Sequence, residues 1–198
     1  MRKLLLILIL TLSFQSWVNA DDIKDFKLEG ISVGDSLLYY MTKNEIKMAL
    51  SSSAEVGIGD EKFIVIWGPK SMKDIYDTFQ VTYKFNDKKY TVHAIDGQLD
   101  FINDFKGCKI KKKEIEKDIK NLLGNIKPNS WQNNHVADKT GKSKVVATDF
   151  ILNTGGQIQI TCTDWSKEMF EENQWEDDLS ISLRTEKYQN FIDSPKYK

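Results

Sequence analysis

Two segments of the chain alternate apolar and polar residues, and this alternation constrains the fold more than any other feature. Residues 78–96 and residues 146–162 each read as two strands joined by a short turn. Because successive side chains of a strand point to opposite faces, each segment can bury one face and leave the other polar. Strands joined by tight turns pair antiparallel. The chain is therefore expected to form its core on an antiparallel sheet.

The first hairpin is expected to turn at Asp87-Lys88. This turn pairs Tyr83 with Val92 and Val81 with Ala94. All the apolar members of the hairpin then lie on one face, as a sheet with one buried face requires.

The second hairpin is expected to turn through a three-residue loop, Thr154-Gly155-Gly156, because glycine adopts the left-handed conformation that such loops need. This loop pairs Phe150 with Ile160 and Thr148 with Cys162. Cys162 is then on the apolar face of the hairpin.

The remaining elements are predicted from periodicity and capping residues. A strand is expected over 63–67 and another over 179–183, and helices over 36–41, 43–50, 109–123 and 188–192. Asp35 should cap the first helix and Thr42 the second, by a capping box with Glu45. Residues 128–144 carry no periodic signal and are expected to form a long polar loop.

These elements predict an α+β fold, a mainly antiparallel sheet built from hairpins. Short N-terminal helices and one longer amphipathic helix should pack on the sheet. A single domain is expected over 21–198, and a degenerate two-half organisation, 21–105 and 106–198, is an alternative description of the same segment.

The first twenty residues predict export. Arg2 and Lys3 precede an apolar run from Leu4 to Phe14, and Val18-Asn19-Ala20 fits a cleavage site before Asp21. The apolar run is too short to cross a membrane, which needs about 20 residues. We therefore expect a signal peptide over 1–20, and a periplasmic or secreted protein without a transmembrane segment.

Two cysteines remain after residue 20. In an exported protein, Cys108 and Cys162 favour a disulfide, and the expected helix over 109–123 could carry Cys108 to Cys162. Two buried thiols, or a redox pair, are the alternatives. The chain has no Cys-x-x-Cys spacing and only two histidines, so zinc and thioredoxin-like chemistry have little support, and neither a metal nor a cofactor is expected.

The charge of the chain argues against nucleic acid. Without Arg2 and Lys3, 26 of the 28 basic residues remain against 29 acidic residues, and only Arg184 is an arginine. Bidentate recognition of phosphate and guanine depends on arginine. No nucleic-acid partner is expected.

Two short motifs resemble catalytic signatures. Gly34-Asp35-Ser36-Leu37 resembles the signature of a class of serine esterases and lipases, in which an Asp-x-x-His supplies the base. Neither His93 nor His135 has an aspartate three residues before it, so Ser36 is interpreted as part of a helix start. Gly141-Lys142-Ser143 matches the end of a phosphate-binding loop, but a strand rather than a helix should follow it.

The candidate binding residues come from two polar segments. The 128–144 segment and the aromatic-acidic stretch 165–178 combine rings with charged groups, a mixture that suits sugars, small ligands or protein partners. The candidates are Trp131, His135, Asp138, Lys139, Trp165 and Trp175. His93 is interpreted as an isolated surface residue.

The EGISxGDSLL start, the HxADKxGKS loop and the ITCTDWS segment together resemble a family of exported bacterial proteins, a resemblance that implies no particular activity. More distantly, the start of the mature chain is similar to small outer-membrane assembly lipoproteins and β-lactamase-inhibitor proteins. That similarity implies a helix pair on an antiparallel sheet and a protein partner. The chain lacks the lipidation cysteine of the lipoproteins.

The sequence favours a non-enzymatic binding or interaction module, with another envelope protein as its expected partner. A serine esterase using Ser36 is the first alternative, and a carbohydrate or small-ligand binder using Trp131, Trp165 or Trp175 is the second.

Overall fold

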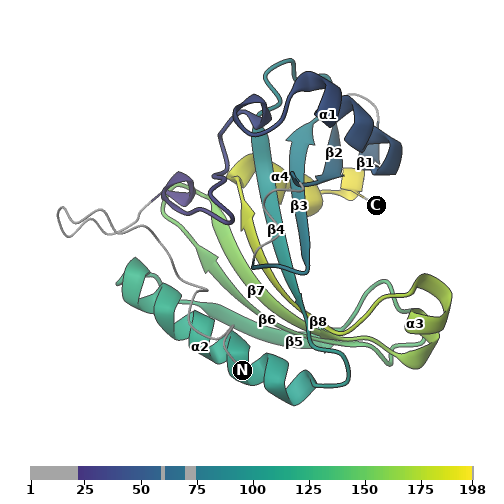
Figure 1. Cartoon of the computed structure of the whole chain (residues 1–198). Helices are drawn as coiled ribbons and strands as arrows, with labels where there is room; N and C mark the ends of the chain where they lie inside the picture. Colours follow the sequence, from purple (N-terminus) through teal and green to yellow (C-terminus); the bar gives the residue numbers. More distant parts are fainter. Residues whose placement is uncertain (1–21, 59–60, 70–74, 198) are drawn as a thin grey trace.

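The computed structural model describes residues 22–58, 61–69 and 75–197, and its centre is one antiparallel sheet of eight strands (Figure 1). The order across the sheet is β1-β2-β3-β4-β8-β7-β6-β5, so β4 and β8 join the two halves. The strands are β1 (Ala54–Ile58), β2 (Glu61–Trp67), β3 (Thr78–Lys84), β4 (Val92–Asp100), β5 (Asn129–Asn134), β6 (Lys144–Ile151), β7 (Gln157–Asp164) and β8 (Asp178–Arg184). The α+β fold expected from the sequence is confirmed.

The long helix α2 (Phe105–Leu123) packs on β7 and β8 from the apolar face of the sheet (Figure 1). Its stripe of Ile115, Ile119 and Leu123 is buried in the main core. The helix begins four residues earlier than expected, because Asp104 caps it by accepting a hydrogen bond from the Gly107 N–H.

The expected disulfide is present and ties α2 to the sheet. Cys108 in the first turn of α2 is bonded to Cys162 of β7, with their Cα atoms 6.0 Å apart. Both residues are buried in the main core.

The N-terminal segment covers the other half of the apolar face. It contains η1 (Ile23–Asp25), η2 (Leu37–Tyr39), α1 (Lys43–Ala49) and η3 (Leu50–Ser52). Thr42 and Glu45 form the expected capping box at α1. The helix expected over 36–41 is only the 3₁₀ turn η2, and its cap is Ser36 rather than Asp35, whose carboxylate instead accepts hydrogen bonds from the Ser32 N–H and the Tyr40 hydroxyl.

The first hairpin has the expected register near its turn and loses it further on. Tyr83 pairs with Val92 as expected, but Val81 pairs with Ile95 rather than Ala94. A bulge between Thr82 and Tyr83 causes the difference, since it adds one residue to one strand.

The second hairpin has the expected faces but a register shifted by two residues. Phe150 pairs with Ile158, not Ile160, and Thr148 pairs with Ile160, not Cys162. The loop has three residues but lies one position earlier, because Gly155, with φ of 83°, is its last residue and Leu152 bonds to Gly156. A shift of two keeps every side chain on its face.

Segments 54–58 and 129–134, neither of which is predicted as a strand from the sequence, are the two edge strands β1 and β5. The expectation of a long loop over 128–144 is therefore wrong for its first half. The stretch 165–178 contains a short helix, α3 (Lys167–Asn173), with Ser166 as its cap.

The C-terminal residues pack on the opposite, polar face of the sheet, at its β1–β4 end. There α4 (Glu186–Ile192) places Tyr188 and Phe191 against Phe63 of β2 and Ala94 of β4. The turn η5 (Pro195–Tyr197) follows it. None of the helices in the described part of the chain is both long enough and apolar enough to cross a membrane.

Candidate functional site

The face of the sheet that points away from α2 carries rows of polar side chains. Gln80 of β3, Asp96 of β4, Ser182 of β8, Gln159 of β7 and Asp149 of β6 lie opposite one another in register across five strands. Because side chains alternate, the intervening residues of the same strands form the apolar core.

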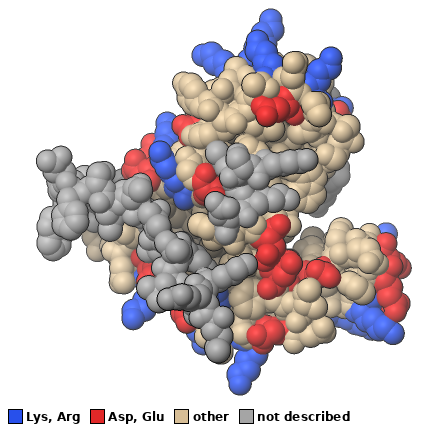
Figure 2. Space-filling model, viewed as in Figure 1, with Lys and Arg blue, Asp and Glu red and all other residues tan. Residues whose placement is uncertain are grey.

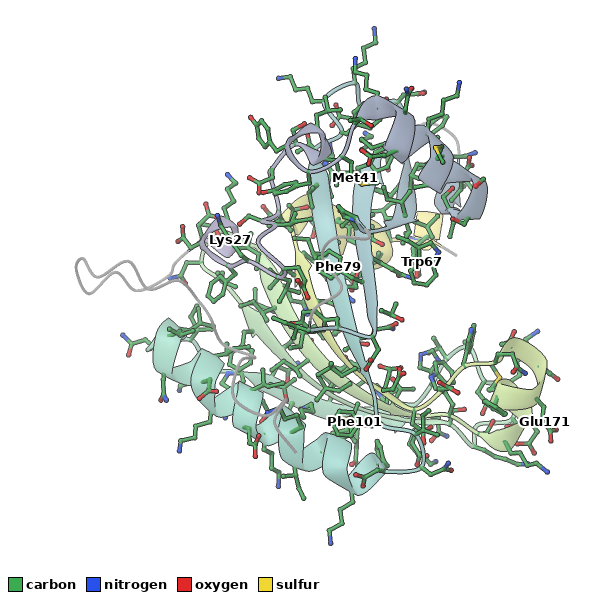
Figure 3. All side chains as sticks on the ribbon, in the orientation of Figure 1. Lys27, Met41, Trp67, Phe79, Phe101 and Glu171 are labelled. Atoms are coloured by element: carbon green, nitrogen blue, oxygen red, sulfur yellow. A yellow bond between two sulfur atoms is a disulfide. The ribbon has the colours of Figure 1, made fainter. Side chains whose placement is uncertain are left out.

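A second polar row runs beside the first. It contains Gln98 of β4, Ser180 of β8 and Thr161 of β7, which are paired in register. Trp67 lies opposite Gln80, at the β2 edge of this same face, and Figure 3 shows it on the polar side of the sheet.

Apart from Asp149, the residues of the two rows form the floor of a groove with a volume of about 350 Å³. One end of the groove is bounded by Tyr188 and Tyr197, from α4 and η5. The other end is bounded by His135 and Trp165, close to α3. Figure 2 shows the outline of the molecule notched beside the part that carries α3, with acidic side chains gathered at the notch.

The centre of the groove holds one acid and one base. The Ser182 hydroxyl donates a hydrogen bond to Asp96, and the Arg184 Nη2 lies 3.3 Å from the Ser182 Oγ and 4.0 Å from the Asp96 Oδ1. Arg184 is the sole arginine after residue 20, and its charge is offset by Asp96. The middle of the groove is therefore polar but close to electrically neutral.

Three rings from separate elements pack against one another at one end of the groove, with neighbouring ring planes tilted by 51° and 52°. His135 comes from the loop between β5 and β6, Trp165 from the end of β7 and Trp175 from the segment between α3 and β8. The ring centroid of Trp165 lies 4.2 Å from that of His135 and 4.6 Å from that of Trp175. Three of the six residues predicted as binding candidates thus lie in one cluster, which we call the ring stack.

A buried carboxylate joins the ring stack to the groove floor. Asp178 is 9% exposed and accepts hydrogen bonds from the Trp165 side chain, whose only donor is the indole N–H, and from the Ser180 hydroxyl at 2.7 Å. Burial, with smaller contributions from Asp100 and Asp177, raises the pKa of Asp178 to about 6 against the effect of these hydrogen bonds. Its charge therefore changes close to neutral pH.

The other predicted candidates lie apart from the ring stack. Trp131 of β5 is on the polar face, and its indole N–H donates to Asp149 at 2.7 Å. Lys139 is exposed in the β5–β6 loop. Asp138 is buried inside that loop, and both of its carboxylate oxygens accept hydrogen bonds from Thr140 and Ser143.

Ser36 has the contacts of a helix cap. Its hydroxyl donates to the Lys89 carbonyl at 2.6 Å and accepts a hydrogen bond from the Leu38 N–H at 3.3 Å. A serine nucleophile needs a basic acceptor for its proton, and a peptide carbonyl is not one. His93, the nearer histidine in sequence, instead contacts the Thr185 hydroxyl at 3.1 Å and packs edge-on against Phe63.

The groove floor was missed at the level of sequence. Its residues are the polar members of the alternating strands, which were read as the solvent side of the sheet. The signal that could have found them is the presence of large hydrogen-bonding groups, Gln80, Gln98, Gln159 and Arg184, at those positions.

Within the described ranges, no group of three or more His, Cys, Asp or Glu side chains is arranged to hold a metal ion. No protein-family model matches the chain, and no significant match is found among curated proteins or solved structures.

Proposed function

We propose that the protein is an exported binding module that performs no chemical reaction and holds its ligand in the groove on the polar face of the sheet. The observation that carries this proposal is the groove itself, a floor of polar side chains from β3, β4, β8 and β7 between two aromatic ends. Its volume of about 350 Å³ is within the usual range for small-ligand sites, roughly 300–1,000 Å³.

Hydrogen-bonding groups on the floor support a binding role. Gln80, Gln98 and Thr161 line the groove. The side-chain hydrogen bonds described above for the floor join other residues. Gln80, Gln98 and Thr161 can each both donate and accept. A ligand with several polar atoms could therefore be held without displacing the internal contacts of the fold.

Export is proposed from the first twenty residues, which precede the described part of the chain. The disulfide between Cys108 and Cys162 supports the proposal, because structural disulfides persist in oxidising compartments. N-terminal sequencing of the protein recovered from its native cells should start at Asp21, and a chain that starts at Met1 would contradict the cleavage.

The binding proposal is tested by filling the groove. The purified mature protein is incubated with an extract of the cell envelope and washed, and the retained compounds are identified by mass spectrometry. Thr161→Trp places a large ring on the groove floor. Ile110→Trp is the matched control, because Ile110 is 53% exposed on α2, on the other side of the sheet.

The wild-type protein and Ile110→Trp should retain the same compound, and Thr161→Trp should lose it. Circular dichroism must show that all three proteins are folded. Equal retention by folded Thr161→Trp, or no retained compound at all, would overturn the groove as the binding site.

A further inference from the structure

We infer that the ligand of the groove is a neutral carbohydrate of one or two sugar rings. This inference rests on the proposed function, and it identifies the chemical class that the groove selects. It follows from the charge of the groove, the chemistry of its floor and the position of the ring stack.

The charge of the groove disfavours anions. Its only arginine, Arg184, is offset by Asp96, and Asp178 adds a second carboxylate at the ring stack. Further acids lie at that end, where burial and then the charges of Asp77 and Glu176 raise the pKa of Asp100. A phosphate or carboxylate would meet more negative than positive charge there.

The acids at that end are also poorly placed to hold a cation. Asp77 accepts a hydrogen bond from the Asp100 N–H, and Asp177 accepts from the N–H groups of Asn103 and Trp165. One oxygen of Asp77 and both oxygens of Asp177 thus bind the backbone of the loops, and among the described residues no three such side chains are arranged to hold a metal ion.

The floor disfavours an apolar ligand. It presents the hydroxyls of Thr161 and Thr163 and the amides of Gln80 and Gln98. An apolar molecule would bury these groups without partners, at a cost of about 1–3 kcal/mol for each. Sugar hydroxyls both donate and accept, as the floor groups do, so each can be satisfied.

The aromatic rings at the ends of the groove suit the faces of a sugar ring. Sugar rings combine hydroxyls around the edge with C–H groups on their faces, and aromatic rings pack favourably on such apolar surface. Trp165 and His135 bound one end of the groove and Tyr188 and Tyr197 the other. Trp175 is 39% exposed and extends the ring stack toward solvent. The volume of about 350 Å³ is at the small end for ligand sites and offers space for one or two sugar rings.

The test titrates the mature protein with neutral disaccharides at pH 7. Maltose, cellobiose and N,N′-diacetylchitobiose are the probes, each with its monosaccharide, and a uronic acid disaccharide is the charged comparison. Intrinsic tryptophan fluorescence and calorimetry report binding, since Trp165 and Trp175 lie at the site.

Two variants and one matched control locate the site. Thr161→Val removes one floor hydroxyl and keeps the shape of the side chain, so it should raise Kd by roughly three- to tenfold. Trp175→Ala should raise Kd by about tenfold. Phe170→Ala removes a ring that is 43% exposed on the neighbouring helix α3 and outside the ring stack, so Kd should not change.

Saturable binding of at least one neutral probe that is weakened in both groove variants and kept in Phe170→Ala would support the inference. Tighter binding of the charged disaccharide, or no binding of any neutral probe, would overturn it. So would equal Kd values in all four proteins. If the envelope extract still yields a compound that depends on the groove, the binding function stands and only the carbohydrate class fails.

Discussion

At the scale of single residues, Ser36 shows how a catalytic motif can have a purely structural role. Its hydroxyl joins η2 to the Lys89 carbonyl, 53 residues away in the chain. Losing a cap of this kind costs about 0.5–2 kcal/mol. Ser36→Ala should therefore lower the free energy of unfolding by about that amount, as measured by urea denaturation.

Ester hydrolysis provides the functional side of the same test. The wild-type protein and Ser36→Ala should show equal, background rates with short-chain nitrophenyl esters. Ser52→Ala is the control, since Ser52 is an exposed serine whose hydroxyl also donates to a carbonyl. An esterase rate that disappears only with the Ser36 hydroxyl would establish catalysis at that residue.

Asp138 is a second residue whose role is decided by its contacts. Side-chain hydrogen bonds from Ser143 and Thr140 hold the pKa of Asp138 well below its usual range. The Gly-Lys-Ser letters that suggest a phosphate loop thus belong to a turn organised by a carboxylate. Asp138→Ala should lower the free energy of unfolding, because the buried N–H and hydroxyl of Ser143 lose their acceptor.

Lys139→Ala is the matched control for this residue, because its exposed side chain should contribute less than about 0.5 kcal/mol. Thermal or urea unfolding distinguishes the two variants. Equal stability of Asp138→Ala and the wild-type protein would show that the loop does not depend on its carboxylate.

At the scale of elements, the sequence predicts the strands that have one apolar and one polar face. The hairpins β3–β4 and β6–β7 bury one face, so their strands and their apolar sides are visible in the alternation. The edge strand β5 is polar on both faces, and β1 buries none of its side chains fully, so neither has that signal. The pairing register of the strands is harder to predict than their positions. It depends on the bulge at Thr82 and the left-handed conformation of Gly155, which are features of backbone geometry.

The sequence predicts only part of the candidate site. His135, Trp165 and Trp175 stand out in the sequence as rings within polar segments. The floor does not, because the paired residues Ala94 of β4 and Arg184 of β8 are 90 positions apart in the chain, and no local pattern reveals that they pair. Only the adjacency of the two strands brings Asp96 beside Arg184.

The disulfide is the element-scale feature with the largest expected energy. It closes a sequence separation of 54 residues, for which the chain-entropy treatment gives about 4 kcal/mol. The double variant Cys108→Ala, Cys162→Ala should lower the free energy of unfolding by roughly that amount. Dithiothreitol should destabilise the wild-type protein equally.

The double variant is its own control for the reductant, because dithiothreitol should not change its stability. If reduction leaves the wild-type protein as stable as before, the bridge is not a structural one. Loss of groove binding is not expected, since both cysteines lie on the apolar face.

At the scale of the whole molecule, the buried Asp178 and the half-buried His93 give opposite dependences of stability on pH. Asp178 has a raised pKa of about 6, so the folded state holds more protons than the unfolded state and its contribution is lost as pH rises from about 4 to 6. Burial and, next, the charge of Lys187 lower the pKa of His93 to about 4. Its contribution is instead lost as pH falls from about 6.5 to 4.

Because the two pH dependences oppose each other, replacing Asp178 should make the dependence due to His93 visible. Asp178→Asn keeps an acceptor for Trp165 and removes the buried charge, so it should stabilise the protein at pH 7 by about 1–3 kcal/mol and have no effect near pH 4. The stability of this variant should then fall on acidification, as His93 becomes charged. Urea denaturation at pH 4, 5, 6 and 7 measures the profile, with the exposed Asp25→Asn as control. A difference between Asp178→Asn and the wild-type protein that stays constant from pH 4 to pH 7 would show that Asp178 does not titrate in this range.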